Sequence, residues 1–162
     1  MIHAGSGGVG SFAIQFAVHI GAEVATTVGP TGLDIAKALG AKYVIDYKSQ
    51  RFEDVVRNFD AVFDTMGGET QARSLQVLKR GDLLVTIVGV SVEQNVAEKL
   101  GVSMKAFTMH PDGKQLVEIA GLVVAGAVKP IIDQIFPFDH GKQALLYSKT
   151  GRAKGKIVIK MS

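Results

Sequence analysis

In the first part of the chain, the spacing of apolar residues is first typical of a helix and then of a strand. After an apolar start at 1–3, apolar residues recur at i, i+3, i+4, i+7, i+8 and i+11, at Val9, Phe12, Ala13, Phe16, Ala17 and Ile20. This period is typical of one helix face, and Gly21 follows as a helix stop. The β-rich run 23–28 then predicts a strand. Strand, glycine turn, helix and strand within about 28 residues is the length of a βαβ unit.

The same alternation continues toward the middle of the chain. The pattern predicts helices over 33–39, 52–57, 70–78 and 93–100, and strands over 43–45, 61–63, 83–88 and 105–109. A further helix begins at Asp112, the expected N-cap, has Gln115 where a capping box needs it, and ends at Gly126. Strands and helices that alternate with short connections predict a parallel sheet covered on both faces.

The last part of the chain has a different pattern. Prolines and glycines break it into short pieces, at Pro130, Pro137, Gly141, Gly151 and Gly155, and a strand over 156–160 follows. We therefore divide the chain into a sheet domain over 1–127 and a C-terminal segment over 128–162.

Three glycines follow the first predicted strand. Gly5, Gly7 and Gly10 have the G-x-G-x-x-G spacing, in which they allow a tight turn, close approach of a pyrophosphate, and close packing of the next helix. The phosphates then lie at a helix N-terminus, where free N–H groups favour negative charge. A chain with 19 glycines in 162 residues also forms plain glycine turns, but the βαβ context favours nucleotide binding. The predicted fold is a Rossmann doubly wound parallel sheet of about six strands, with an appended C-terminal segment.

Composition narrows the class of protein. The chain is 47% hydrophobic and 20% charged, which is typical of a globular protein. Its longest uncharged apolar run, 119–128, is about half of the roughly 20 residues that a membrane span needs, and the start lacks the basic region of a signal peptide. We expect a soluble, cytoplasmic protein without a membrane partner.

Cysteine and charge exclude further classes. No cysteine is present, so this chain has no disulfide and no thiolate zinc site, and we expect it to bind no metal. The net charge of +3 is small and scattered, apart from a cluster over 149–156. Nucleic-acid binding is not expected, because it usually requires more positive charge on one face.

Several motifs in the same order resemble one family. They are the stretches 2–10 (IHAGSGGVG), 36–41 (AKALGA), 44–47 (VIDY), 60–68 (DAVFDTMGG) and 155–158 (GKIV). Together they resemble the medium-chain dehydrogenase/reductases of the zinc-type alcohol dehydrogenase superfamily, in particular the quinone oxidoreductase-like branch that uses NADPH. The likeness runs the length of the chain.

The resemblance implies an NADPH-dependent oxidoreductase that transfers hydride to a small-molecule substrate such as a quinone. In this family a catalytic domain precedes the first Rossmann strand, whereas the fingerprint here begins near Met1. We therefore expect a cofactor domain whose catalytic half is absent, and an isolated chain without activity. The alternative is a non-catalytic nucleotide-binding or oligomerisation module.

The end of the second strand bears on the choice of cofactor. NAD-specific sites have an Asp or Glu there, which accepts hydrogen bonds from the ribose 2′-hydroxyl. This chain has no carboxylate over 26–31, where Thr27, Gly29, Pro30 and Thr31 stand, so NADP is favoured over NAD. The resemblance places Tyr47 beside the 2′-phosphate or the adenine, with Lys48 and Arg51 as possible cationic helpers. Without the resemblance, a tyrosine that only covers a strand end is an equal interpretation.

Further contacts are implied by position at the carboxyl ends of the strands. Thr65, Met66 and Gly67 would lie near the adenosine, Val88, Gly89 and Val90 near the nicotinamide ribose, and Phe107 and Thr108 near the carboxamide. The resemblance also brings Arg152 or Lys156 near the phosphates. The predicted cofactor-binding set is Gly5, Ser6, Gly7, Gly8, Val9, Gly10, Thr27, Gly29, Pro30, Thr31, Tyr47, Thr65, Met66, Gly67, Val88, Gly89, Val90 and Phe107.

Other nucleotide-binding and catalytic patterns fit less well. The stretch 151–156 lacks the glycine spacing and the Ser or Thr of a P-loop. No tyrosine has a lysine four residues on, as a short-chain dehydrogenase needs, and the acid of a methyltransferase is missing after the second strand. The four histidines lie on different elements, which indicates structural or surface roles. Because the sixth strand would be a sheet edge, we expect a homodimer through it.

Overall fold

Five parallel strands build the main sheet in the computed structural model, which describes residues 1–161. They are β1 (Ala25–Val28), β2 (Tyr43–Asp46), β3 (Phe59–Asp64), β4 (Leu78–Thr86) and β5 (Ser103–Ala106). β1 pairs with β2, and β3 pairs with β4, which pairs with β5.

The start of the chain joins these two groups of strands. Ile2 forms parallel bridges with Thr26 of β1 and with Phe63 of β3. The Ile2 amide donates to the Ala25 carbonyl at 2.8 Å, and the Phe63 amide donates to the Met1 carbonyl at 2.8 Å. The order is therefore β2, β1, residues 1–3, β3, β4 and β5, with the chain winding outward in both directions. The predicted doubly wound parallel sheet is confirmed, although its first strand is reduced to bridges at one residue.

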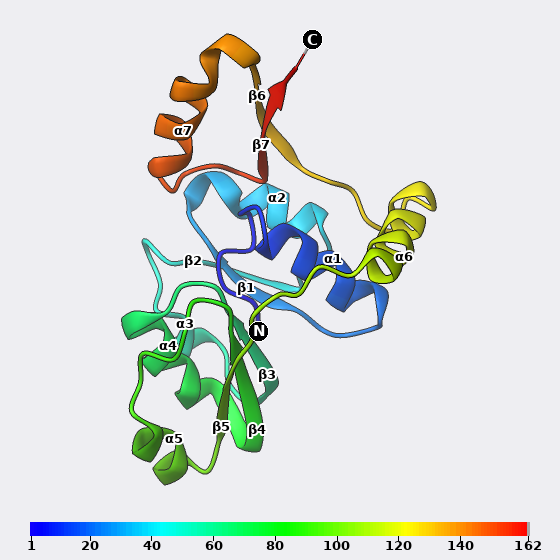
Figure 1. Ribbon diagram of the computed structural model, residues 1–162. Coiled ribbons are helices and arrows are strands. Elements are labelled where there is room, and N and C mark those ends of the chain that lie inside the picture. Colours follow the sequence, from blue (N-terminus) through cyan, green and yellow to red (C-terminus); the bar gives the residue numbers. More distant parts are fainter. Residues whose placement is uncertain (162) are drawn as a thin grey trace.

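Helices cover both faces of this sheet (Figure 1). They are α1 (Gly10–His19), α2 (Leu33–Ala38), α3 (Phe52–Val55), α4 (Gly68–Ser74) and α5 (Gln94–Leu100). A further helix, α6 (Gly113–Val124), follows β5 and has no buried residue. Two apolar clusters form the core: one includes Ile2 and Ile14 of α1, and the other includes Met1, Phe52 of α3 and Leu75. Met1 and Ile2 belong to different clusters because successive side chains of an extended segment point to opposite faces of a sheet.

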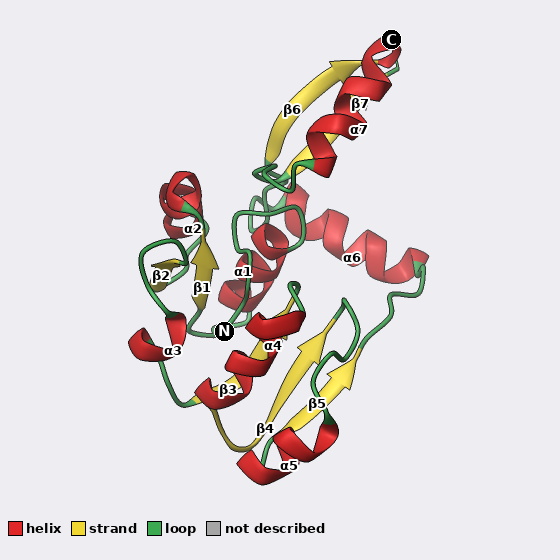
Figure 2. Ribbon diagram, turned by 90° about the vertical axis from the view of Figure 1, so that its left-hand side faces the viewer, coloured by secondary structure: helices red, strands yellow, loops and turns green. Residues whose placement is uncertain are grey.

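Beyond α6, a second small sheet projects from the first (Figures 1 and 2). β6 (Ile132–Pro137) and β7 (Lys156–Lys160) pair in parallel, and α7 (Gly141–Lys149) connects them. The β7 strand agrees with its prediction, but β6 and α7 were missed. Pro137 does not interrupt β6, because it is the last residue of the strand, a position that tolerates proline.

The strand predicted over 105–109 is β5, which ends at Ala106, and two other predicted boundaries were wrong by four or five residues. The helix predicted over 70–78 is α4, which ends at Ser74, followed by a 3₁₀ turn, and β4 begins at Leu78 instead of residue 83. Gly81, whose φ is +94°, lies inside β4, and the pairing with β3 shifts register between Phe59 and Ala61. The glycine therefore marks an irregularity within a strand and not the end of a helix. At α6 the prediction is confirmed, since Asp112 accepts from the Lys114 and Gln115 amides at 2.8 and 3.2 Å.

Candidate functional site

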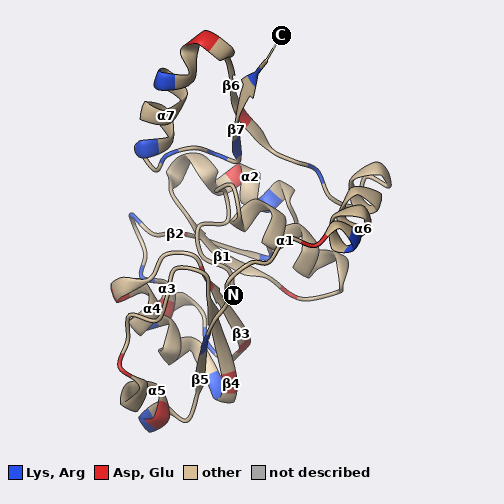
Figure 3. Ribbon diagram, in the orientation of Figure 1, with Lys and Arg blue, Asp and Glu red and all other residues tan. Residues whose placement is uncertain are grey.

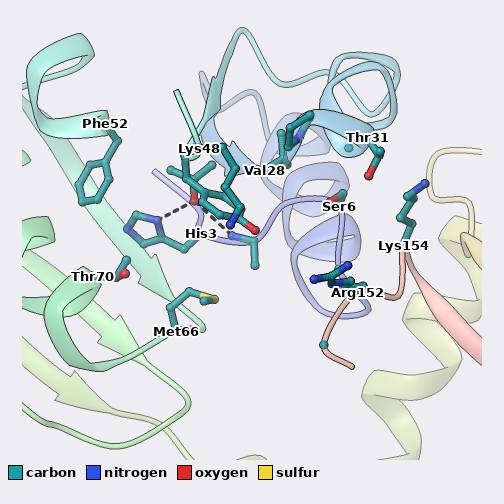
Figure 4. Close-up of a pocket in the computed structure, with 18 of the residues that line it drawn as sticks. His3, Ser6, Val28, Thr31, Lys48, Phe52, Met66, Thr70, Arg152 and Lys154 are labelled. Carbon is teal, nitrogen blue, oxygen red and sulfur yellow. Dashed lines mark hydrogen bonds between the residues drawn. The ribbon is translucent and has the colours of Figure 1, made fainter. Parts of the chain in front are cut away.

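A cavity of about 530 Å³ opens at the carboxyl ends of β1 and β2 (Figure 4). In doubly wound sheets this edge, at the point where the strand order reverses, is where ligands bind. The cavity is lined by His3, Ala4, Ser6, Gly7, Thr27, Val28, Gly29, Pro30, Thr31, Gly32, Tyr47, Lys48, Gln50, Phe52, Met66, Thr70, Arg73, Gly151, Arg152, Ala153 and Lys154. Five separate stretches of the chain therefore meet around one space, namely 3–7, 27–32, 47–52, 66–73 and 151–154.

The glycine turn forms one wall, and its backbone explains the residue types. The Gly5 amide donates to the Thr27 carbonyl at 3.1 Å, and the Gly7 amide donates to the Ala4 carbonyl at 2.9 Å. A Cβ atom on Gly10 would collide with the Ala4 carbonyl, so only glycine fits where α1 begins. A Cβ on Gly7 would meet only the Ala4 oxygen, at 3.2 Å. The turn is thus a backbone cradle at a helix start, which fits a phosphate group.

The cavity is lined by cations. Lys48, Arg73, Arg152 and Lys154 line it, and no carboxylate does so among residues 1–161. Arg73 is already paired, because its guanidinium donates to both carboxylate oxygens of Glu53 at 2.7 and 2.5 Å. This pairing, stronger than the opposing effect of desolvation, lowers the pKa of Glu53 to about 2.

The other three cations are free to face a ligand. Lys48, Arg152 and Lys154 have no carboxylate oxygen within 4.0 Å in the described part of the chain. Figure 4 shows them around the same cavity, Lys48 from the stretch after β2 and the other two from the turn before β7, and Figure 3 shows the charges over the whole fold. This arrangement suits a ligand that carries several negative charges.

His3 forms the floor of the cavity and is fully buried. Its Nδ1 lies 2.9 Å from the Thr27 hydroxyl and its Nε2 lies 2.7 Å from the Ser74 hydroxyl. Burial lowers the pKa of His3 to about 4, only partly opposed by Asp64, so the ring is neutral near pH 7. The structural role predicted for the histidines fits this residue, whose two ring nitrogens are both occupied.

The turns after β3 and β4 are held by a buried network beside the cavity. Asp64 accepts from the Met66 and Gly67 amides at 2.9 and 3.0 Å, and from the Gln71 side chain at 2.7 Å. Gln71 also donates to the Gly89 carbonyl at 3.0 Å. Burial alone would raise the pKa of Asp64, but these hydrogen bonds together lower it. The network fixes both turns relative to each other.

The structure brings together only part of the predicted cofactor-binding set. Eight of its members line the cavity: Ser6, Gly7, Thr27, Gly29, Pro30, Thr31, Tyr47 and Met66. The remaining members do not line it, namely Gly5, Gly8, Val9 and Gly10 of the glycine turn, and Thr65, Gly67, Val88, Gly89, Val90 and Phe107 of the later turns. Of the two tail cations suggested by resemblance, Arg152 lines the cavity and Lys156 does not.

Sequence reasoning missed several lining residues. Gln50 and Phe52 follow β2, while Thr70 and Arg73 lie on α4. Their position in the sequence could have indicated them. Each lies within about three residues of a predicted helix start that follows a strand, at the edge of the sheet where ligands bind. Lys154 was noted only as part of a basic cluster.

The described residues contain neither a metal-binding cluster nor a membrane-spanning helix. Across 1–161, no group of three or more His, Cys, Asp or Glu side chains could hold a metal ion. Within the same residues, every helix is too short or too polar to cross a bilayer.

Comparison with known proteins identifies the family. The model of the zinc-binding dehydrogenase family matches residues 39–159, and the chain belongs to this family. The resemblance to the medium-chain dehydrogenase/reductases, with the nucleotide-binding part represented, is thereby confirmed.

Individual relatives agree over nearly the whole chain. A 2-methylene-furan-3-one reductase from Solanum lycopersicum is 35% identical over 98% of this chain and 39% of the relative. An NADPH-dependent alkenal/one oxidoreductase from Arabidopsis thaliana is 32% identical over 96% of this chain and 38% of the relative. The solved quinone oxidoreductase from Coxiella burnetii superposes with a TM-score of 0.93 at 30% identity, over 99% of this chain and 52% of that one. The chain spans about two fifths to one half of the length of these relatives.

Proposed function

We propose that this chain is the nucleotide-binding part of an NADPH-dependent oxidoreductase that transfers hydride to a quinone or another activated carbonyl or alkene. One observation carries the proposal: the cavity joins a glycine phosphate cradle to three unpaired cations and, among residues 1–161, has no carboxylate in its lining. An NADPH molecule bears a pyrophosphate and a 2′-phosphate, and the latter alone carries about −1.5 to −2 charges. Such a ligand matches the charge of the site.

Each part of the cavity has a role in this proposal. The backbone around Ser6 and Gly7, at the start of α1, holds the pyrophosphate. Thr31, Tyr47 and Lys48 line the side where β1 and β2 end, and there they hold the 2′-phosphate. NADPH supplies the hydride when bound, and the chain binds it and orients its nicotinamide.

The names of the relatives support the class of substrate. They are reductases of a methylene-furanone, of alkenals and enones, and of quinones. All of these are activated carbonyl or conjugated alkene compounds, which accept hydride readily. In the proposed enzyme, most substrate contacts come from a further domain, which corresponds to the part of the relatives that this chain does not span.

Calorimetric titration of the 162-residue chain with NADPH and with NADH tests the cofactor. We expect NADPH to bind at least about tenfold more tightly, because a 2′-phosphate gains charge-assisted hydrogen bonds that a hydroxyl lacks. In the Lys48→Ala variant this preference should shrink while NADH binding changes little. Tighter binding of NADH by the wild-type chain would refute the proposed cofactor.

A second function is a non-catalytic nucleotide-binding or oligomerisation module, which the exposed edge beyond β5 supports. β5 is the last strand of the sheet, and Phe107 and Met109 just after it are 54% and 69% exposed. A homodimer that pairs two such edges would cover them. Light scattering decides the oligomeric state, and an assay of quinone reduction with NADPH separates the functions, since turnover by this chain alone would exclude the module.

A further inference from the structure

A side chain of α1 binds the backbone of the C-terminal unit, which is defined here as residues 128–161. The carboxamide of Gln15, which is only 8% exposed, lies against the backbone of Lys129. Its Nε2 donates to the Lys129 carbonyl at 3.0 Å, and its Oε1 accepts from the Lys129 amide at 2.7 Å. The two residues are separated by 114 positions in sequence.

The orientation of this carboxamide is fixed. Nε2 uses its second hydrogen to donate to the Ser11 carbonyl, one helical turn earlier, at 2.9 Å. Reversing the amide would place Nε2 against the Lys129 N–H, which is also a donor, and Oε1 against the Ser11 and Lys129 carbonyl oxygens, so only one orientation satisfies all three groups. Gln15 therefore acts as a two-point connection between α1 and the chain that enters β6.

A second contact lies close to the glycine turn. The Lys156 amide donates to the Ile131 carbonyl at 2.7 Å, two residues after Lys129. A Cβ atom on Gly8 would lie 3.1 Å from the Gly155 carbonyl oxygen, so the turn before β7 rests directly on the glycine turn. The Lys156 ammonium lies 5.7 Å from the centroid of the Phe12 ring on α1.

These contacts determine where two cations lie. The turn between α7 and β7, residues 151–154, lines the cavity with Arg152 and Lys154 (Figure 4). No main-sheet strand pairs with β6 or β7, so the contacts with α1 and the glycine turn position this unit. A shift of Lys129 would reach the basic turn through Ile131, whose carbonyl accepts from the Lys156 amide and lies against Gly155.

We propose that Gln15 is a positioning residue for nucleotide binding, because its hold on Lys129 places Arg152 and Lys154 against the phosphates of the ligand. The proposal rests on the proposed function for the identity of that ligand. Gln15 itself does not line the cavity, and its effect reaches the ligand only through the basic turn. The C-terminal unit then becomes part of the cofactor site and not only an appended segment.

A double-mutant cycle on the 162-residue chain tests the proposal, with NADPH affinity measured by calorimetry. Gln15→Met keeps the side-chain volume but removes both bonds to Lys129, and should weaken NADPH binding about tenfold. The Arg152→Ala/Lys154→Ala variant should weaken it more, and adding Gln15→Met to that variant should change the affinity by less than about twofold. Gln143→Met, an exposed glutamine on α7, is the matched control and should leave the affinity unchanged.

A loss that is equally large when Arg152 and Lys154 are already absent would overturn the positioning role, because Gln15 would then act through general stability. A readout without nucleotide separates this proposal from the previous one. Hydrogen exchange at the Lys129 amide, and trypsin cleavage after Arg152 and Lys154, should both accelerate in Gln15→Met. If the wild-type chain binds neither NADPH nor NADH, the proposed function and the cofactor role of Gln15 both fail. Unchanged exchange and cleavage would refute the connection itself.

Discussion

Nε2 of His3 and the hydroxyl oxygen of Ser74 lie 2.7 Å apart, a contact that ties the centre of the sheet to the last residue of α4. Because the Ser74 hydroxyl donates to the Thr70 carbonyl at 2.6 Å, it accepts from Nε2–H of His3. Nδ1 then accepts from the Thr27 hydroxyl, at 2.9 Å. The network requires a neutral imidazole with its proton on Nε2.

The neutral state of His3 makes stability depend on pH. Burial lowers the pKa of His3 from 6.5 to about 4. Between these values the unfolded chain binds a proton that the folded chain does not, so stability is full above about pH 6.5 and falls as the pH drops toward 4. We expect a loss of about 3 kcal/mol over this range from this residue.

Urea unfolding of the wild-type chain and of His3→Gln at pH 7 and pH 4 measures this loss. The wild-type chain should lose about 3 kcal/mol more than the variant, since glutamine does not titrate. The N-terminal amine and Glu53 titrate in both proteins, and their contributions cancel in the comparison. Equal losses in the two proteins would mean that folding does not lower the pKa of His3.

Thr26, in the centre of β1, has a buried hydroxyl with no partner in the described part of the chain. Thr26→Val keeps the shape of the side chain and removes this unpaired group, so we expect the free energy of unfolding to rise by about 1 kcal/mol. Its neighbour Thr27 provides the control, because its hydroxyl contacts His3. Thr27→Val should lower the free energy of unfolding by about 1–2 kcal/mol. A loss of stability in Thr26→Val would indicate a hydrogen bond at that hydroxyl.

Substitutions at Gly7 and Gly10 should have different effects, the first on nucleotide binding and the second on stability. In Gly10→Ala the new methyl group collides with the Ala4 carbonyl, and we expect a loss of about 2–4 kcal/mol of stability. In Gly7→Ala the closest atom is the Ala4 oxygen at 3.2 Å, so the loss should stay below about 1 kcal/mol. NADPH binding should nevertheless weaken at least about tenfold, because the methyl group stands where a phosphate must approach. Thermal unfolding and calorimetry measure the two effects, and unchanged binding in Gly7→Ala would place the phosphates elsewhere.

A substitution at Gly29 should change the preference between NADPH and NADH. Its φ of −81° suits any residue, and a Cβ there would be in ordinary contact with the Tyr47 hydroxyl, at 3.5 Å. Gly29→Asp places a carboxylate at the end of β1, where it should weaken NADPH binding at least about tenfold and leave NADH binding equal or stronger. Gly29→Asn has nearly the same shape without the charge, and should retain most of the NADPH affinity. Equal effects of Asp and Asn would show that charge at this position does not select the cofactor.

The sequence predicted those parts of the fold in which one pattern repeats over several residues. The first helix was clear because Val9 to Ile20 follow one helical face, and the fingerprint supplied its start. The strand at Ile2 could be inferred only as a stub, because three residues are too few for a period of two. Leu78 was assigned to a helix, although it belongs to a strand. It is in a strand because it pairs with Phe59 across the sheet, and such a pairing leaves no signal in the neighbouring sequence.

The candidate site shows the same limit more clearly. Gly7 and Thr31 could be proposed because they follow predicted strands at one edge of the sheet, whereas the role of Tyr47 was implied by the family resemblance. Lys154 lines the same cavity from about 120 residues further on, and spacing along the chain carries no information about such a return. Arg152 was suggested only by the family resemblance. The contact of Gln15 with Lys129 depends on tertiary packing alone.

The central place of Ile2 in the sheet also bears on how the protein folds. Its two neighbours, Thr26 and Phe63, lie on either side of it, and the second is about 60 residues away in the sequence. This strand must therefore wait for residue 63 before both of its edges are paired. Until then it presents unpaired backbone groups, and pairing across such a separation is slow. Refolding of this domain should be limited by closure at Ile2, with β1 and β2 joined early and β3 and β4 added afterwards.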